Sequence, residues 1–194
     1  MNSIIIFGEI GAGKDTAAEI LAKHLNSEIV KLGWKIRKDV DEICDRITIG
    51  DKNRRELYQY YGQCMRKVFG EDIWNMILYN KISEGIAKNK SYIVADGRQP
   101  NEFAFWTNIG FIPVAVVADE NIRMKRVKAR DGFDQSANLN HETEINAREI
   151  TKKIKELEPT GRAFTIINNG TLLELEEQIN QLISNIVTCH LVGS

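Results

Sequence analysis

Short apolar runs and longer amphipathic segments alternate along the chain. A short apolar run is typical of a strand buried on both faces, and apolar residues spaced three and four apart are typical of a helix. The apolar runs predict strands over residues 3–7, 29–32, 92–95, 112–117 and 164–167. The helical spacing predicts helices over residues 14–25, 54–68, 72–87, 101–108, 119–130, 142–155 and 172–186. A polar segment with Ile36, Val40 and Ile43 at helical spacing predicts one more helix.

This alternation predicts the fold class. Strands that alternate with helices favour a parallel sheet covered by helices on both faces, which is a three-layer α/β architecture. Gly70 separates two of the predicted helices, and we expect a helical hairpin there. Polar segments at 50–53 and 131–139 are typical of a turn and a loop. With 194 residues, and with neither a repeat nor a linker, the chain is expected to form one domain.

The composition is that of a folded protein and argues against several classes of partner. Hydrophobic residues make up 43% of the chain and charged residues 27%, which argues against disorder. Lys and Arg number 26 against 27 Asp and Glu, so the net charge is −1 and no nucleic-acid polymer is expected as a partner. No apolar stretch reaches the roughly 18 residues of a membrane span, so no membrane partner is expected. The oligomeric state, a homodimer included, stays open.

The cysteines and the first apolar run bear on the cellular compartment. Cys44, Cys64 and Cys189 are widely spaced and odd in number, which fits reduced thiols better than disulfides or a zinc site. The apolar run at residues 4–7 has no Lys or Arg before it and ends at Gly8, unlike a signal peptide. We therefore expect a cytoplasmic protein.

The strongest chemical signal is the segment Gly8-Glu9-Ile10-Gly11-Ala12-Gly13-Lys14-Asp15-Thr16, which lies between a predicted strand and a predicted helix. Its spacing, a glycine, four residues and then Gly-Lys, is that of a phosphate-binding loop, or P-loop. Small residues let successive backbone N–H groups converge on phosphate oxygens, and the helix N-terminus adds its positive end. Lys14 would neutralise the β- and γ-phosphates. The predicted ATP-binding residues are Gly11, Ala12, Gly13, Lys14, Asp15 and Thr16.

The residue after the lysine departs from the usual P-loop. Asp15 stands where Ser or Thr commonly offers a hydroxyl to Mg²⁺, and Thr16 follows it. Mg²⁺ prefers oxygen ligands and keeps several waters, so Asp15 is a candidate ligand, either directly or through water. Asp96 ends an apolar strand, where a carboxylate would organise Mg²⁺ or its waters. A weaker alternative is that Asp15 is only a first-turn acid favoured by the helix dipole.

Arginines outside the loop are candidates for holding the donor and acceptor phosphates. Arg98 lies two residues after Asp96, and positive charge at that point suits an acceptor phosphate. Arg126 and Arg130 are four apart on one face of a predicted basic helix, which we interpret as part of a lid at about 119–158. For this helix, the alternative is a charged face that contacts only solvent. The predicted catalytic residues are Lys14, Asp96, Arg98, Arg126 and Arg130.

The helical region at about 33–88 holds the candidates for binding the acceptor. Arg66 could grip an acceptor phosphate, and Gln63 lies three residues before it on the same predicted helix. Trp74 could stack on a base, although aromatic residues at helical spacing more often belong to a core. The sequence has no Asn-Lys-x-Asp motif, so a GTPase is not expected. An acceptor phosphate is itself a nucleophile and needs no general base.

Four segments of the sequence carry a family likeness. They are Gly8 to Thr16 with its Gly-Lys-Asp-Thr ending, Leu57 to Trp74, Asp96 to Glu102, and Ile166 to Leu172 before an acidic helix. Together they resemble phage-type and bacterial deoxynucleoside monophosphate kinases over nearly the whole chain. The resemblance implies a P-loop nucleoside monophosphate kinase fold, Mg-ATP as donor and a nucleoside 5′-monophosphate as acceptor.

The resemblance also implies roles for individual residues. It assigns Arg66 and Arg98 to the acceptor phosphate, Asp96 to the waters of the metal, and Arg126 and Arg130 to the lid side of the phosphates.

Four further residues enter through the same resemblance. Asn168 is expected on the ATP side. His141, Thr143 and Glu144 are similar to a His-x-[Ser/Thr]-Glu segment that follows the family's lid, and no role is assigned to them.

One segment departs from this family and keeps other acceptors open. Residues 119–131 look more like dephospho-coenzyme A kinases and adenylate kinases. Dephospho-coenzyme A offers a ribose hydroxyl, which would need a general base, with Asp15 or Asp96 as the candidate. A different class of protein, a non-catalytic regulatory module that binds ATP, is a further alternative.

Overall fold

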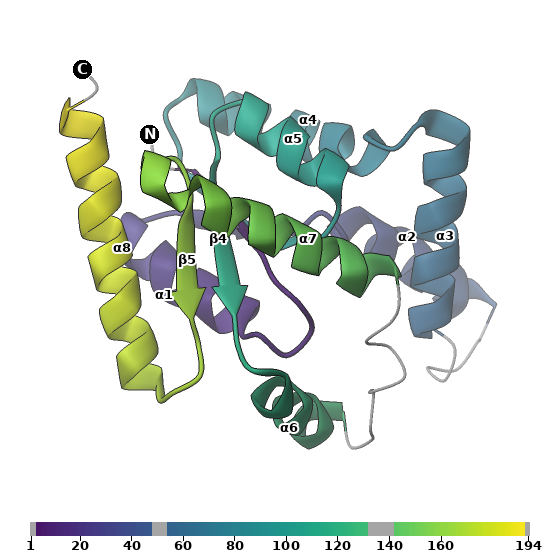
Figure 1. Ribbon diagram of the computed structural model, residues 1–194. Coiled ribbons are helices and arrows are strands. Elements are labelled where there is room, and N and C mark those ends of the chain that lie inside the picture. Colours follow the sequence, from purple (N-terminus) through teal and green to yellow (C-terminus); the bar gives the residue numbers. More distant parts are fainter. Residues whose placement is uncertain (1–2, 48–53, 132–141, 193–194) are drawn as a thin grey trace.

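The chain folds around one parallel β-sheet. The computed structural model describes residues 3–47, 54–131 and 142–192, and the predicted turn at 50–53, residues 132–139 of the predicted loop and His141 lie outside them. The sheet has the strand order β2-β3-β1-β4-β5, and all its neighbouring strands are parallel (Figure 1). The strands are β1 (Ile4–Phe7), β2 (Glu28–Val30), β3 (Tyr92–Gly97), β4 (Ile112–Val117) and β5 (Phe164–Ile167).

Helices connect the strands and cover both faces of the sheet. Successive residues of β1 point to opposite faces, and all of them are fully buried. Ile4 and Ile6 belong to a core formed with α1 and α8, and Ile5 and Phe7 to a second core with α4, α5 and α7. The helices are α1 (Lys14–Leu25), α2 (Trp34–Arg46), α3 (Arg54–Phe69), α4 (Ile73–Ala87), α5 (Pro100–Asn108), α6 (Glu120–Asp131), α7 (Glu142–Leu157) and α8 (Leu172–Val192), with a short 3-10 helix, η3 (Glu158–Thr160), after α7. The predicted three-layer α/β fold is confirmed.

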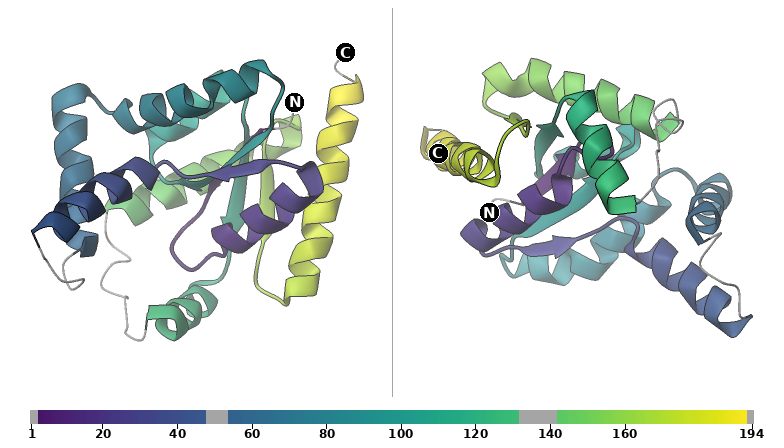
Figure 2. Two further views of the ribbon diagram at one scale, coloured as in Figure 1. Left: turned by 180° about the vertical axis from the view of Figure 1, so that it is seen from behind. Right: turned by 90° about the horizontal axis from the view of Figure 1, so that it is seen from below.

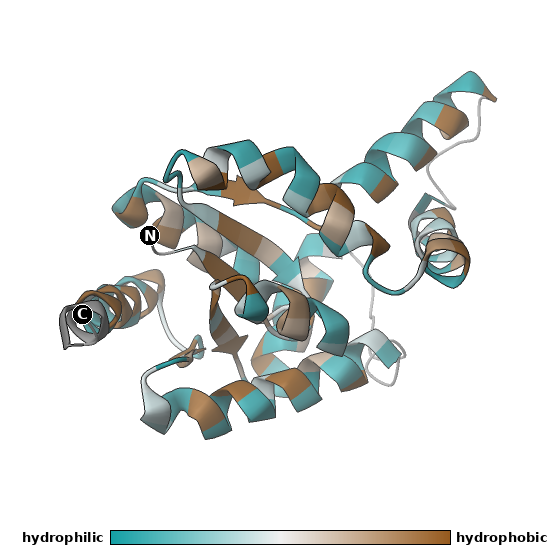
Figure 3. Cartoon of the chain, turned by 90° about the horizontal axis from the view of Figure 1, so that it is seen from above, coloured by the Kyte–Doolittle hydropathy of each residue, from teal (hydrophilic) through white to brown (hydrophobic). Residues whose placement is uncertain are grey.

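The helices α2 and α3 form an arm that extends from one end of the sheet (Figures 1 and 2). Polar contacts join the two helices: Tyr58 Oη donates to Asp41 at 2.5 Å, and Tyr61 Oη donates to Asp39 at 3.1 Å. Hydrophilic residues predominate along α2 where it leaves the sheet (Figure 3). Val40 and Cys44 are the buried apolar residues of α2, so the arm combines these polar contacts with a small apolar contribution.

The predicted helical hairpin is only partly correct. α3 packs against α2, whereas α4 turns away and packs on the sheet through Leu78 and Ile82. Figure 1 shows α3 standing across the axis of α4. Gly70 lies between the two helices at φ +97°, a left-handed conformation that glycine adopts without strain. The turn at Gly70 is the one expected, but it redirects the chain to the core.

The predicted bounds of β2 and β3 need correction. β2 ends at Val30, two residues earlier than expected, and β3 continues through Asp96 to Gly97. The Asp96 carboxylate accepts hydrogen bonds from the backbone amides of Leu32 and Gly33, at 2.6 and 3.1 Å, where the chain turns from β2 into α2. β3 extends to Gly97 because Gly97 pairs with Phe7 of β1.

None of the helices in the part of the chain that the structure describes is both long and apolar enough to cross a membrane.

Candidate active site

The segment between β1 and α1 has the form of a phosphate-binding loop. Gly11 and Gly13 have φ values of +78° and +93°, which L side chains rarely adopt. A Cβ at Gly11 would lie 2.5 Å from the carbonyl oxygen of Arg123, and a Cβ at Gly13 would lie 2.2 Å from Nδ2 of Asn168. Conformation and close contact therefore both require glycine at these two positions.

Lys14 is buried at the centre of this loop. Its Nζ donates to the carbonyl oxygens of Gly8 and Glu9, at 2.5 and 3.0 Å. Burial lowers the pKa of Lys14 from 10.5 to about 7, and the positive charge of Arg98 adds to this effect. An incoming phosphate would counter both causes, so Lys14 is placed to gain its full charge when a polyanion binds.

Asn168 closes the loop from the carboxyl end of β5. Its side chain is buried, and its Nδ2 donates to the carbonyl oxygen of Ala12 at 2.9 Å. Arg126 of α6 donates to the backbone oxygen of Asn168 at 3.0 Å. The structure thus brings Asn168 and Arg126 to the P-loop. Arg130, one turn further along α6, is exposed.

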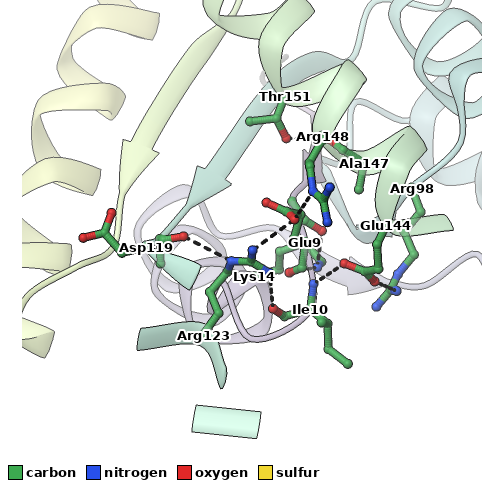
Figure 4. A network of polar contacts seen from close by, with 12 residues as sticks. Glu9, Ile10, Lys14, Arg98, Asp119, Arg123, Glu144, Ala147, Arg148 and Thr151 are labelled. Carbon is green, nitrogen blue, oxygen red and sulfur yellow. Dashed lines mark hydrogen bonds and ion pairs between the residues drawn. The ribbon is translucent and has the colours of Figure 1, made fainter. Parts of the chain in front are cut away.

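A second set of contacts holds the P-loop through Glu9 (Figure 4). The Oε1 of Glu9 lies 3.0 Å from Nη2 of Arg123 and 2.7 Å from Nε of Arg148. Arg123 is 3% exposed and also donates to the carbonyl oxygen of Ile10 at 3.2 Å. Sequence reasoning treated Arg123 as a candidate for a solvated face. Arg123 lies in the first turn of α6, and its place in the sequence does not indicate that its partners are Glu9 and Ile10.

Glu144 links this loop to Arg98, which follows β3. Its Oε2 accepts from the backbone amide of Ile10 at 2.8 Å, and its Oε1 accepts from Nη1 of Arg98 at 3.0 Å (Figure 4). The side chain is 4% exposed. The His-x-[Ser/Thr]-Glu segment therefore supplies a buried carboxylate between the two halves of the site.

A cavity of about 300 Å³ lies beside the P-loop, between the arm and the carboxyl end of β3. Arginines from three elements line it, namely Arg37 of α2, Arg66 of α3 and Arg98 after β3. Sequence reasoning identified Arg66 and Arg98 but missed Arg37. The backbone amide of Arg37 donates to Gly33, but among the described residues its guanidinium forms neither a hydrogen bond nor an ion pair, so it can receive an anionic ligand.

Carboxylates accompany the other two arginines of the cavity. Glu144 binds Arg98, and Oε1 of Glu102 lies 3.7 Å from Nη2 of Arg66. Burial raises the pKa of Glu102 to about 7, although its bonds from the backbone amides of Arg98 and Gln99 act in the opposite direction. The cavity therefore combines fixed positive charge with a carboxyl group that titrates near neutrality.

The remaining predicted acceptor residues occupy different places. Trp74 lines the cavity but is 2% exposed, and its Nε1 donates to the carbonyl oxygen of Gly62 at 3.1 Å. It packs against the ring of Tyr61 with centroids 6.0 Å apart. Gln63 is exposed and is not among the lining residues, whereas Gln59, one turn earlier, lines the cavity. Of these two glutamines of α3, Gln59 is thus the one that lines the cavity.

The two predicted metal ligands already have protein partners. Asp15 accepts from Nζ of Lys31 at 2.6 Å, with its side chain 66% exposed, and both oxygens of Asp96 accept backbone amides. The described residues contain no cluster of three or more His, Cys, Asp or Glu suited to a metal. Mg²⁺ takes few protein ligands beside phosphate oxygens and water, and the exposed carboxylate and hydroxyl of Asp15 and Thr16 fit that role.

The fold and this site define the class of the protein. A parallel sheet with a P-loop after its central strand, and helices on both faces, is the α/β fold of P-loop kinases. Residues 4–147 match the family described as AAA domain, and the chain belongs to that family. No curated protein sequence matches the chain.

Solved structures are similar to the chain over nearly its whole length. Shikimate kinase from Acinetobacter baumannii, in complex with shikimate, is 16% identical with a TM-score of 0.54, over 97% of this chain and 94% of that one. Shikimate kinase from Aquifex aeolicus is 13% identical with a TM-score of 0.53, over 97% and 98%. A gluconokinase from Sinorhizobium meliloti is 14% identical with a TM-score of 0.49, over 96% of each chain. At these identities the two shikimate kinases support the fold alone.

Proposed function

We propose that the protein is an ATP-dependent kinase that phosphorylates a nucleoside 5′-monophosphate. One observation carries this proposal: the cavity lined by Arg37, Arg66 and Arg98 adjoins the P-loop, and both are joined at Glu144. Three guanidiniums beside a triphosphate site suit a substrate that is itself a phosphate, because two polyanions must be held in contact.

The reaction follows from these two halves. An oxygen of the acceptor phosphate attacks the γ-phosphorus of ATP, the bond from that phosphorus to the β,γ-bridging oxygen breaks, and ADP leaves with the electron pair. The attacking oxygen is already ionised, so no proton has to be removed. The acceptor phosphate would be bound by Arg37, Arg66 and Arg98, and the γ-phosphate by Lys14 with Arg126 and Arg130.

Mg²⁺ would be held by Asp15 and Thr16 together with the phosphate oxygens. When bound, it would neutralise charge on the β- and γ-phosphates. Both oxygens of Asp96 accept backbone amides at the turn into α2, so we assign Asp96 first to positioning α2 at the rim of the cavity. An interaction with the waters of the metal would be its second role.

A hydroxyl acid is a second candidate for the acceptor. The same arginines would bind a carboxylate, and a cavity of about 300 Å³ is also suited to a small sugar acid. A hydroxyl acceptor needs a general base, for which Asp96 and Glu102 are the candidates at the cavity, whereas a phosphate acceptor needs none and would use all three arginines. The cavity thus favours a phosphate acceptor.

An ADP-release assay over a panel of acceptors tests the proposal. The panel holds all ribo- and deoxynucleoside monophosphates, dephospho-coenzyme A, shikimate and gluconate. We expect turnover with at least one monophosphate, and a loss of about 10³-fold or more in kcat for Lys14→Ala. Lys23→Ala, an exposed lysine of α1, is the matched control and should keep full activity.

Two outcomes would contradict the proposal. Turnover only with shikimate, gluconate or dephospho-coenzyme A would replace the nucleotide with a hydroxyl acceptor. ATP binding without turnover on any acceptor would favour a regulatory module instead.

A further inference from the structure

The buried carboxylate of Glu144 is the strongest feature that the proposed reaction leaves without a role. It lies on the third residue of α7, and its two oxygens bind groups from two other parts of the chain. Oε2 accepts the amide of Ile10 in the P-loop, and Oε1 accepts the guanidinium of Arg98 at the cavity. One rigid group of three atoms therefore spans the donor and acceptor sides.

We propose that Glu144 is a positioning residue that couples binding in the arginine cavity to the geometry of the P-loop. The inference rests on the proposed function, because it takes the cavity as the acceptor site and the P-loop as the ATP site. Glu144 lines the cavity, but protein groups hold both of its carboxylate oxygens, so we assign it a positioning role and no direct bond to either substrate.

The geometry at Arg98 explains how the coupling would work. A guanidinium has five N–H donors in one plane, and Glu144 occupies Nη1. The Arg98 side chain is 34% exposed, so it also has surface that faces the cavity. An anion that binds there would compete with Glu144 for the guanidinium of Arg98 and would shift the guanidinium plane. The Glu144 carboxylate, which is bonded to that guanidinium, would move with it.

The geometry at Ile10 carries the shift to the donor side. The Ile10 amide is a backbone group of the P-loop, so its direction is tied to the positions of the loop's other amides. The Glu144 carboxylate is sensitive to a movement of the Ile10 amide or of the Arg98 guanidinium. A buried carboxylate that loses a hydrogen-bond partner costs more free energy than one that keeps both. Acceptor binding should thus change the affinity of the P-loop for ATP, and ATP binding should change the affinity of the cavity for the acceptor by the same factor.

Neighbouring residues of α7 support the same arrangement. Asn146 donates to the side chain of Gln99 at 2.7 Å, next to Arg98, and Arg148 binds Glu9, next to Ile10. The first two turns of α7 therefore contact both sides at more than one point, and Glu144 is the residue that touches both at once (Figure 4).

The test is the variant Glu144→Gln, which keeps the volume and removes the charge. A carboxamide has one acceptor oxygen, so its NH₂ group must face either the Ile10 amide or Arg98, and one of the two bonds is lost. The matched control is Glu142→Gln, an exposed glutamate in the same turn.

The readout is a binding cycle measured by calorimetry. The Kd of a non-hydrolysable ATP analogue is measured with and without the monophosphate that the panel identifies, or with inorganic phosphate if none gives turnover. The wild type and Glu142→Gln should show a coupling of about 5-fold or more, within the range common for linked sites, and Glu144→Gln should show a factor near one. For an active enzyme, kcat of Glu144→Gln should fall about 10- to 100-fold while both KM values change less than about threefold.

The results separate this inference from the proposed function. Failure of the wild type on every acceptor overturns the kinase proposal, while the cycle with inorganic phosphate still tests the coupling. Equal coupling in Glu144→Gln and wild type, or no coupling in the wild type, overturns the role of Glu144.

A measurement on the wild type covers the case in which the variant does not fold. Addition of the cavity ligand alone should shift the amide resonance of Gly13, a P-loop residue outside the cavity lining, in a ¹H–¹⁵N spectrum. An unchanged Gly13 resonance at saturating ligand overturns the inference.

Discussion

The P-loop and the arginine-lined cavity, which we propose as the donor and acceptor sides of the site, are built in opposite ways. The P-loop is one continuous segment whose phosphate-binding groups are backbone amides, glycines and the buried Lys14. The acceptor cavity is lined by side chains from α2, α3, α4, β3, α5 and α7. Backbone geometry thus fixes the donor side, whereas the acceptor side depends on how separate helices pack.

This difference has a consequence for specificity. A loop built from main-chain groups recognises phosphates, which every nucleoside triphosphate shares. A cavity built from side chains on a polar arm can change with single substitutions, at little cost to the core. The donor should therefore be hard to alter by mutation and the acceptor easy.

The largest expected effect that tests this contrast is on Arg37. Arg37→Gln removes a guanidinium that has no partner among the residues the structure describes, and it should raise the acceptor KM about 10- to 100-fold, as for the loss of a charge-assisted hydrogen bond. The KM for ATP should stay within about twofold. Steady-state kinetics with each substrate varied in turn measures both.

The control for Arg37 is its neighbour on α2. Lys38→Gln removes the same charge at an exposed position outside the cavity lining and should change neither KM. An effect of Arg37→Gln on ATP as large as that on the acceptor would remove the distinction between the two sides.

A smaller effect is expected when a methyl group is added to the donor loop. Gly13→Ala and Gly70→Ala impose the same left-handed strain, at φ +93° and +97°, of about 1–2 kcal/mol. Only Gly13 has a neighbour, Asn168, within reach of the new Cβ, whereas Gly70 has nothing within 4 Å. Gly13→Ala should therefore cost about 1–2 kcal/mol more stability, because the Asn168 bond to Ala12 is lost.

Denaturant unfolding of the two variants measures this difference, and ATP binding adds a second criterion. Gly13→Ala should weaken ATP binding and Gly70→Ala should not. Equal stabilities and equal ATP affinities would show that Asn168 does not close the loop.

The smallest expected effect concerns protons on the donor side. The pKa of Lys14 is about 7 in the ligand-free protein, and bound phosphates should raise it. ATP binding at pH 8 should therefore take up nearly one proton, and affinity should fall up to about tenfold per pH unit above 7. Calorimetry in buffers of different ionisation enthalpy measures the uptake.

The same shift sets the sign of a stability effect. Between pH 7 and 10.5 the folded, ligand-free protein binds fewer protons at Lys14 than the unfolded chain, so this residue makes stability rise with pH in that window. Proton uptake by Lys14→Ala as large as that of the wild type would assign the titration to another group.

The sequence carries a stronger local signal for the P-loop than for the residues that line the cavity. Glycine spacing and Lys14 are local signals, and they follow directly after an apolar strand. Arg37 gave no such signal, because an arginine on a polar helix looks the same whether it faces solvent or a cavity. Its role depends on the packing of α2 beside β3, which no local pattern encodes.

Long-range pairs explain the other omissions. Glu9 and Arg123 are far apart in the sequence, and nothing in either segment indicates that they form an ion pair. Glu144 stood out as part of a motif but had no role until the structure placed it against Ile10 and Arg98. The turn from β2 into α2 likewise involves a distant residue, Asp96.

The strand order has a consequence for folding during synthesis on the ribosome. β1 is the central strand, and its two neighbours, β3 and β4, begin at Tyr92 and Ile112. At roughly 5–20 residues per second, the apolar run Ile4–Phe7 waits several seconds for both partners. During synthesis this segment, which is fully buried in the folded protein, is thus an unpaired apolar strand. Apolar surface that is exposed in this way makes a nascent chain prone to aggregate and is what chaperones bind.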